Sequence, residues 1–595
     1  MGRTARSALG RMLREASAAG GESTATGAPI DEVTDLRADR GRTVRVEARD
    51  ALAAYNDTVR QVAERGTPDD LAARASAMAH LRSIGRRDFL KGAGLSAVAL
   101  AAAAVQPRPI RAAASKQPSI AIVGGGLAGL RAAHVLWTKY GWTSTIYEAA
   151  DRVGGRCETQ RGYWANGLLA EMHGEFISSE HASVLNLVKQ FNLGLDDTRA
   201  YPAGTDDTYW VNGGRYTQAQ LNADWQAWAW SLFNDAVRTV PWPQRYNAYN
   251  ATGFQWDHMS VPAWMDRYLP GGTAGSFGGV CLQSQIDEYG GDPADQSALN
   301  LTMVLGYNDS ANGRGYQPKD APFLAGTDER WHVTGGNDAL VTGMANQLPS
   351  GTIQLGQSLI ALKANANGTS TLTFQSGSST RQVTVNSVIL ALPFSTLRDV
   401  DLSKAGLSPL KRSAIDTLGM GTNAKVILEF RGAPWVGDGY TGTTYQDNGF
   451  ISSGWQLVQS ASSGGYTGPT SLWTAYPGGT DTQTIIDRYG LTDDGGVPPT
   501  RMVNDTLRQL EPVLPGVTAA YTGKSWYDFG LMDPNLRGGY SYWRVGQYTG
   551  ISGYEGVAEG RVHFAGEHTT PDAQGFMEGA VLSGERCASE VHSNG

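Results

Sequence analysis

Three glycines between two apolar segments form a group that can bind phosphate. Gly124, Gly126 and Gly129 have G-x-G-x-x-G spacing and follow the apolar run 119–123. Gly124 permits a tight turn, Gly126 lets a pyrophosphate approach the backbone, and Gly129 lets the next helix pack closely on the strand. The first N–H groups of that helix carry partial positive charge, which attracts phosphate. These residues predict a bound nucleotide.

Glu148 completes the pattern. Residues 127–140 carry apolar side chains at helical spacing, and 143–147 form a second apolar run. Glu148 ends that run, where a carboxylate can accept hydrogen bonds from a ribose. The order strand, helix, strand and acid predicts a Rossmann-like βαβ unit rather than an isolated glycine-rich turn.

Two arginines flank a second glycine pair. Arg152, Gly155 and Arg156 belong to the segment R-x-G-G-R, which suits a second approach to the pyrophosphate and to a flavin edge. This extension is unusual in NAD dehydrogenases. Together with the glycine-rich turn it resembles the FAD-binding start of the flavin amine oxidase family. The resemblance implies bound FAD and an α/β fold, with a discontinuous Rossmann-like FAD-binding domain and an inserted α+β substrate-binding domain.

A second signature lies near the C-terminus. The residues F-A-G-E-H-T at 564–569 are followed by G-F-M-E-G-A at 575–580, and the two together closely resemble the closing FAD motif of the same family. A helix that begins near Phe576 would direct its N-terminal dipole at the N1–C2=O side of a reduced flavin. The resemblance implies three further cofactor contacts: Gly566, Glu567 and Met577.

Residues near Tyr540 bear on how FAD is held. Some relatives attach FAD to a cysteine just after a glycine pair that matches Gly538-Gly539, but Tyr540 follows that pair here. We therefore expect non-covalent FAD. The three cysteines of the chain lie far apart and indicate neither a disulfide framework nor a metal site.

Lys425 is the first candidate catalytic residue. It lies in an alternating segment that predicts a strand over 424–430. In relatives, a lysine at this place holds a water against flavin N5, and its ammonium stabilises negative charge as oxygen is reduced. The resemblance implies the same role for Lys425. The alternative is an exposed lysine on the polar face of the strand.

Substrate contacts follow from the resemblance less directly. Many relatives bracket the amine between two aromatic rings, and Phe576 matches one of them. Trp543 and Tyr542 are the candidates for the other ring. Glu175 lies in the segment that matches the one passing over the flavin, where His173 replaces a family glycine. Glu175 either faces a cationic amine or is a structural carboxylate.

The resemblance implies an amine oxidase that converts an amine to an imine and reduces O2 to H2O2. An L-amino-acid oxidase is the nearest alternative. Relatives with that activity often place an arginine where this chain has 175–177, so another arginine, such as Arg544, would have to hold the carboxylate. A flavin desaturase or dehydrogenase with a different electron acceptor, and a protein that keeps FAD structurally, stay open as further alternatives.

The leader predicts export. Arg86 and Arg87 precede a short apolar run and the small residues 112–114, which resembles a twin-arginine signal. We therefore expect a periplasmic or secreted protein. The apolar run is too short for a comfortable membrane span, so we expect no stable membrane insertion.

Composition and charge limit the partners. Of the 595 residues, 41% are hydrophobic and 18% charged, which suits a globular protein with a sizeable core. Residues 1–114 carry a net charge of +5 and the whole chain −8, so the rest carries −13. Such an acidic body argues against nucleic acid. We expect a small amine or amino-acid substrate, with a homodimer as one option for assembly.

The motifs divide the chain into segments. Residues 210–331 lack glycine-rich motifs and concentrate aromatic side chains, which predicts the helical part of a substrate domain. The predicted segments are an N-terminal extension of unknown role (1–81), a twin-arginine signal peptide (82–114), the FAD-binding domain (115–195, 335–395 and 536–595) and the substrate-binding domain (196–334 and 396–535).

Overall fold

The computed structural model describes residues 117–200, 203–308, 315–320, 323, 326–457, 459–460 and 468–594. The predicted N-terminal extension and twin-arginine signal lie outside these residues.

A five-stranded parallel sheet positions the glycine-rich turn. Its order is β11-β2-β1-β15-β26, and every neighbouring pair is parallel. Such sheets have both faces covered, so the central strands are continuous apolar runs. Three separated stretches of the chain supply the strands: β1 (Ile120–Val123), β2 (Thr145–Tyr147), β11 (Ile353–Gln354), β15 (Ser387–Leu390) and β26 (Val562–Phe564).

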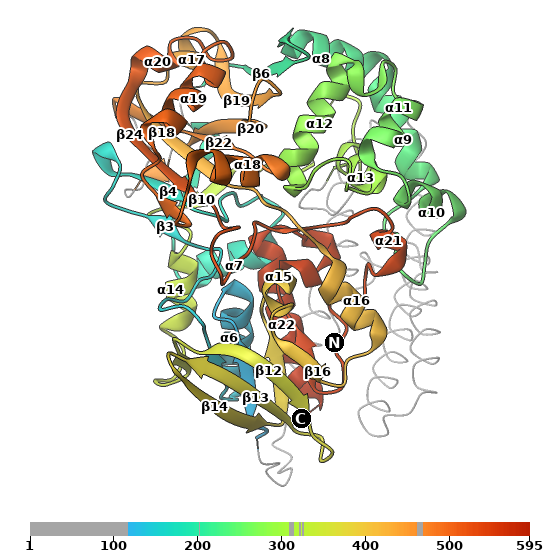
Figure 1. Ribbon diagram of the computed structural model, residues 1–595, viewed down its shortest axis with the longest axis vertical. Helices are drawn as coiled ribbons and strands as arrows, with labels where there is room; N and C mark the ends of the chain where they lie inside the picture. The colour runs from blue at the N-terminus through green and yellow to red at the C-terminus, as the bar shows by residue number, and fades with distance from the viewer. Residues whose placement is uncertain are drawn as a thin grey trace, which may run out of the picture. The chain divides into compact units, whose positions relative to one another are not determined.

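Two long helices, α6 (Leu127–Tyr140) and α22 (Met577–Asn594), pack against each other beside this sheet. The predicted helix over 127–140 is confirmed. It ends at Gly141, whose φ of 70° lets its N–H donate back to the carbonyls of the last turn. The chain's two FAD signatures thus become neighbouring helices (Figure 1).

A four-stranded sheet flanks this layer. It contains β14 (Ser379–Val385), β13 (Ser370–Ser376), β12 (Ser358–Ala364) and β16 (Asp401–Lys404) in that order. The chain changes sheets at Asn386, between β14 and β15. The side-chain oxygen of Asn386 accepts a hydrogen bond from the Ser119 N–H at 3.0 Å, and this contact fixes the residue that connects β14 to β15.

The remaining segments build the second half of the molecule. Figure 1 places its sheet and helices in the upper half, above α6 and α22. The eight-stranded sheet is antiparallel except at β19–β6. Its strands, in spatial order, are β23 (Gly495–Gly496), β24 (Tyr521–Asp528), β18 (Lys425–Arg431), β22 (Thr470–Tyr476), β20 (Ser453–Leu457), β19 (Tyr440–Gln446), β6 (Asp206–Val211) and β7 (Gly214–Tyr216).

Helices dominate residues 218–306, as the aromatic-rich composition predicts. They are α8 (Gln218–Asp224), α9 (Trp230–Thr239), α10 (Ala251–Asp257), α11 (Val261–Tyr268), α12 (Ser276–Tyr289) and α13 (Ala298–Gly306). Further elements are α7 (Ala182–Gln190), α14 (Ala339–Ala345), α15 (Phe394–Leu397), α16 (Pro409–Thr417), α17 (Pro434–Gly437), α18 (Thr480–Tyr489), α19 (Thr500–Leu510), α20 (Val517–Ala520), α21 (Gln547–Gly550), β3 (Thr159–Gln160), β4 (Leu168–Glu171), β5 (Leu195–Asp197), β10 (Trp331–Val333), β17 (Gly419–Met420) and β25 (Ser541–Tyr542). Among the described residues, no helix combines the length and the apolar character needed to span a bilayer.

Close packing of α22 on α6 predicts sensitivity at Gly584. A Cβ there would lie 2.4 Å from the Ala128 carbonyl oxygen, so alanine would push the helices apart. We expect Gly584→Ala to cost about 1–3 kcal/mol, as overpacked cores do, and to lower the Tm in thermal denaturation. Gly437→Ala in α17 is the matched control, because a Cβ there meets nothing within 4 Å. Equal Tm values for the two variants would contradict the close packing.

Candidate active site

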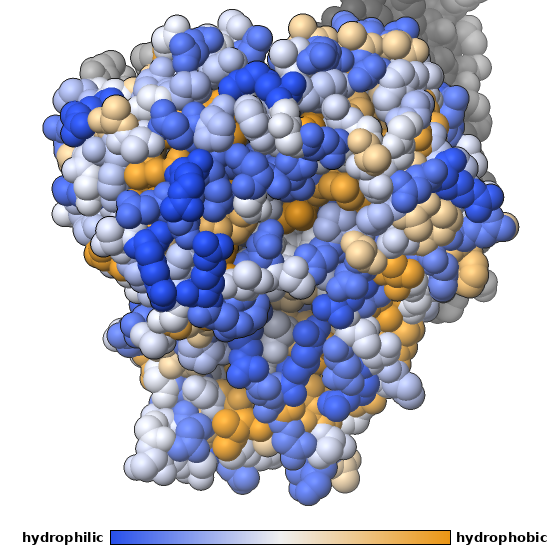
Figure 2. Space-filling view, turned by 45° about the horizontal axis from the view of Figure 1, so that its top comes forward, coloured by the Kyte–Doolittle hydropathy of each residue, from blue (hydrophilic) through white to orange (hydrophobic). Residues whose placement is uncertain are grey.

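One cavity of about 1050 Å³ runs between the two halves of the molecule. On the face shown in Figure 2, hydrophilic side chains cover most of the surface and hydrophobic ones gather around a hollow. Residues from both FAD signatures meet in the cavity. Of the predicted site residues, these line it: Gly124, Gly126, Glu148, Arg152, Gly155, Arg156, Glu175, Lys425, Trp543, Gly566, Glu567, Phe576 and Met577.

The glycine-rich turn has the geometry expected of a phosphate cradle. Gly124 has a φ of 99°, and a Cβ there would lie 2.6 Å from the Ala391 carbonyl oxygen. Gly129 does not line the cavity; a Cβ there would lie 2.0 Å from the Gly124 oxygen, so Gly129 serves helix packing. Gly126 begins α6, and the nearest atom to a Cβ there is 3.8 Å away. The helix start is therefore open to a ligand phosphate.

Glu148 directly follows β2, beside this turn. Its two carboxylate oxygens accept hydrogen bonds from the N–H groups of Gly125 at 2.6 Å and Ala150 at 2.8 Å. Each oxygen keeps further acceptor capacity, and the residue lines the cavity. This arrangement fits the ribose hydroxyls of FAD.

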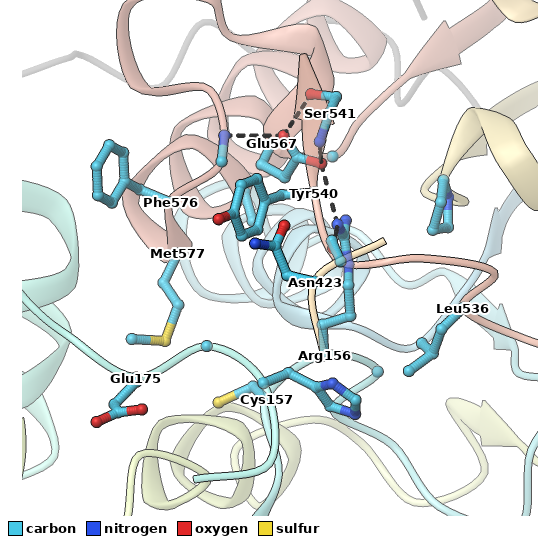
Figure 3. A pocket seen from close by; sticks show the side chains of 18 of the residues that line it. Arg156, Cys157, Glu175, Asn423, Leu536, Tyr540, Ser541, Glu567, Phe576 and Met577 are labelled. Carbon is cyan, nitrogen blue, oxygen red and sulfur yellow. Dashed lines mark hydrogen bonds and ion pairs between the residues drawn. The ribbon is translucent and has the colours of Figure 1, made fainter. Parts of the chain in front are cut away.

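Glu567 joins the two FAD signatures. Figure 3 shows its carboxylate bonded to Ser541, to Arg156 and to a backbone N–H. One oxygen accepts from Arg156 Nη1 at 3.0 Å, and the other accepts from Ser541 Oγ at 2.7 Å and the Gly575 N–H at 2.9 Å. Burial alone would raise the pKa of Glu567, but Arg156 and these hydrogen bonds lower it below its ordinary value.

Arg152 lies at the rim of the same site. Its guanidinium donates to the Gly155 carbonyl at 3.2 Å and pairs with Glu158. Arg152 therefore shapes the 152–156 loop as well as lining the cavity. The open start of α6, the carboxylate of Glu148 and the arginine-flanked loop 152–156 all line the same cavity. The residues present therefore fit FAD.

Aromatic side chains line the cavity near the start of α22. A Cβ on Gly575 would lie 3.6 Å from the Tyr540 ring, so Tyr540 lies beside Phe576, as Figure 3 shows. Trp543 is 1% exposed and its ring centroid lies 5.2 Å from that of Tyr548. The sequence reasoning missed Tyr540 as a cavity aromatic, although it directly follows the glycine pair.

The prediction for Tyr542 needs correction. Tyr542 does not line the cavity; it is 3% exposed, and its ring lies where side chains on Gly291 and Gly419 would be. Its strand β25 pairs with β17, and the ring packs against Gly419 of that strand and against Gly291. Arg544, the candidate carboxylate ligand, is exposed and also does not line the cavity.

Lys425 begins β18 and is 2% exposed, so the alternative of an exposed lysine is wrong. Its ammonium donates to the carbonyls of Glu171 at 2.8 Å and His173 at 3.2 Å, and to Glu175 Oε2 at 2.5 Å. These contacts fix the segment 171–175 against β18.

Histidines near this pair are neutral at physiological pH. Burial lowers the pKa of His173 to about 3, and the neighbouring Lys425 lowers it further. Burial also lowers the pKa of His332 to about 4, against the opposing effect of Glu175. These two imidazoles therefore add no positive charge beside the ion pair of Lys425 and Glu175.

Among the other carboxylates that line the cavity, three interact with one another and no sequence motif marks them: Asp287, Glu288 and Glu329. Asp287 and Glu288 are half-buried, and Glu329 is exposed. Burial raises the pKa of Asp287 to about 6, and partial loss of solvation raises the pKa of Glu329 above its ordinary value. Burial also raises the pKa of Glu288 well above its ordinary value. Neighbouring carboxylates raise the pKa values of Glu288 and Glu329 further, and no ion pair with a cation forms at any of the three within the described residues.

The joint at Glu567 predicts a pH-dependent stability. Glu567→Gln removes the charge paired with Arg156, so we expect it to cost about 1–3 kcal/mol and to lower the Tm. Because the folded-state pKa is lowered, the carboxylate stabilises the protein above its unfolded pKa, and this contribution is lost as pH falls through the folded value. The Tm difference between wild type and variant should shrink below about pH 4. A pH-independent difference would contradict the charge-based account.

Comparisons with known proteins agree with this geometry. A model of the family described as flavin containing amine oxidoreductase matches residues 127–592. The chain is 26% identical over 499 residues to the L-amino-acid oxidase of Siganus canaliculatus, covering 80% of this chain and 85% of that protein. It is 22% identical over 535 residues to the pseudooxynicotine dehydrogenase of Pseudomonas sp, covering 86% and 96%.

Solved structures share the fold. Cyclohexylamine oxidase from Brevibacterium oxydans IH-35A aligns with a TM-score of 0.64 at 18% identity, covering 80% of this chain and 99% of that chain. Putrescine oxidase bound to putrescine aligns with a TM-score of 0.64 at 19% identity, with the same coverage. The family match, which spans most of the chain and both halves of the cavity, leads to the conclusion that this chain belongs to the flavin-containing amine oxidoreductase family and uses FAD.

Proposed function

We propose that this protein is an FAD-dependent oxidase of a cationic amine, with O2 as the electron acceptor. The observation that carries the proposal is one cavity that joins the FAD-binding residues to Asp287, Glu288 and Glu329, which form no ion pair with a cation among the described residues. When bound, FAD would supply the redox chemistry by accepting a hydride equivalent from the C–H bond next to the amine nitrogen. The resulting imine would be hydrolysed by water to an aldehyde and ammonia or a smaller amine, and O2 would take the two electrons to give H2O2. The chain binds and orients the substrate and excludes water.

The carboxylates support an amine over an amino acid. Crowded carboxylates with raised pKa values are stabilised when a cation joins them, so Asp287, Glu288 and Glu329 favour a positively charged group. Glu329 also has a φ of 41°, a strained backbone conformation of the kind that clusters at functional sites. The carboxylate of an amino acid would instead add another negative charge to this group of acids and disfavour their ionisation further.

Arginine placement supports the same choice. The arginines that line the cavity in the described part of the chain are Arg152, Arg156 and Arg199. The first two belong to the FAD-binding segments, and Arg199 is exposed and donates to the Asp328 carbonyl at 3.3 Å. None is a buried fork for a substrate carboxylate, so the L-amino-acid oxidase alternative has less support.

FAD is proposed to be bound non-covalently, because Tyr540 stands where some relatives have a cysteine. Export by the twin-arginine route is proposed from Arg86 and Arg87, the short apolar run that follows them and the small residues 112–114.

A substrate panel tests the proposed activity. The purified protein, loaded with FAD, should release H2O2 with primary amines and diamines and release at least about tenfold less with L-amino acids. Peroxide is measured by a coupled peroxidase assay, and acid precipitation should free the FAD into the supernatant. Peroxide from L-amino acids alone would overturn the amine assignment, and FAD that stays with the precipitate would overturn non-covalent binding.

Charge removal in the cavity tests the substrate contact. We expect Glu329→Gln to raise KM for a cationic amine about fivefold or more with little change in kcat, because ground-state binding is lost. Asp328→Asn is the matched control, since Asp328 binds the Ser179 N–H at 2.8 Å and does not line the cavity. The same KM increase in both variants would show that Glu329 has no specific role.

A further inference from the structure

The ion pair between Lys425 and Glu175 is buried, and it uses every hydrogen-bond donor of the lysine ammonium. Their side chains are 3% and 4% exposed, and the charged atoms are 2.5 Å apart. An ammonium has three hydrogen atoms to donate, and all three of the Lys425 contacts are made with the segment 171–175. No donor is left over in this arrangement to hold a water.

Glu175 is fixed on its other side as well. Its second oxygen accepts from Trp455 Nε1 at 3.0 Å, and His332 Nε2 lies 3.8 Å from the same atom. His332 stacks on Phe176, with 5.1 Å between the ring centroids. The carboxylate therefore stays beside the ammonium instead of rotating into the cavity.

The pair lies where a flavin edge would come close. Both residues line the cavity, and a Cβ on Gly174, between His173 and Glu175, would lie 3.2 Å from Met577 Cγ at the start of α22. Figure 3 shows Glu175 and Met577 on the same side of the pocket. The segment that Lys425 holds therefore lies against the helix start that faces the cofactor.

We propose that Glu175 is a positioning residue that offsets the positive charge of Lys425 and thereby lowers the affinity of the flavin for electrons. An uncompensated ammonium in a site of low dielectric constant would stabilise added negative charge on FAD, whereas the neutral pair does so far less. Glu175 acts through Lys425 and touches no reacting atom. This inference rests on the proposed function, because it assumes FAD in this cavity, and it names a residue that tunes the flavin's affinity for electrons.

Sulfite reports this charge without any amine or oxygen. The sulfur lone pair of sulfite forms a bond to flavin N5, the ring takes up the electron pair, and a nearby cation stabilises the adduct. We expect Glu175→Gln to lower the sulfite Kd at least about tenfold. This is the size of effect that one uncompensated positive charge on Lys425 would have in a site whose effective dielectric constant is about 20. The flavin midpoint potential, measured by dye-coupled titration, should rise in the same variant.

A double-mutant cycle separates charge from structure. Lys425→Met should raise the sulfite Kd. Adding Glu175→Gln to this variant should not lower the sulfite Kd, because the positive charge that Glu175 offsets is gone. Glu175→Asp keeps the charge and should stay within about threefold of wild type. Glu429→Gln is the matched control. Glu429 is a buried carboxylate that lies in β18, as Lys425 does, but it does not line the cavity.

Two results would overturn the inference. One is an unchanged sulfite Kd in Glu175→Gln with FAD bound and Tm near wild type. The other is equal tightening in the presence and absence of Lys425. Absence of amine turnover would count against the proposed function and leave this test readable, because sulfite binding needs bound FAD alone.

Discussion

The contact between Arg156 and Glu567 closes the site. It joins residues 411 positions apart, and Glu567 also binds Ser541 and the Gly575 N–H, so one buried carboxylate holds three segments together. A lone buried carboxylate would cost several kcal/mol, and here the arginine and three hydrogen bonds to Ser541 and Gly575 offset that cost. The cavity wall between the two FAD signatures exists because this contact forms.

The carboxylates of the cavity differ in whether they have partners that offset their charge. On the FAD side, each buried carboxylate has partners: Glu148 has two backbone N–H groups and Glu567 has Arg156. Where we propose that the amine binds, Glu288 and Glu329 have other carboxylates as their charged neighbours. The carboxylates that lack a cationic partner therefore lie where we propose that the amine binds. Lys425 does not neutralise them, because its ammonium is already paired with Glu175.

Much of the fold could be predicted from the sequence. The G-x-G-x-x-G turn, the helix over 127–140 and the helix after Phe576 follow from local patterns, because glycine spacing and apolar periodicity are local properties. The break at Asn386 could not be predicted in this way. It depends on a contact with Ser119, which lies far away in the sequence, and strand pairing of that range leaves no local signal.

The cofactor half of the site was more predictable than the substrate half. Thirteen of the fifteen predicted site residues line the cavity, whereas Gly129 packs a helix and Tyr542 is buried elsewhere. Phosphate recognition needs fixed glycine positions, so it leaves a motif. Asp287, Glu288 and Glu329 come from separate segments that only the tertiary fold brings together, and their raised pKa values arise from that proximity. Tyr540 was visible in sequence but was considered only as a replacement for cysteine.

The central claim is that a cationic amine reduces FAD in this cavity. Anaerobic mixing of the FAD-loaded protein with amines, followed by the visible absorbance of the flavin, tests that step apart from oxygen. The account predicts that a primary amine or diamine bleaches the flavin and that an L-amino acid leaves it oxidised. Bleaching by an L-amino acid with no response to any amine would contradict it.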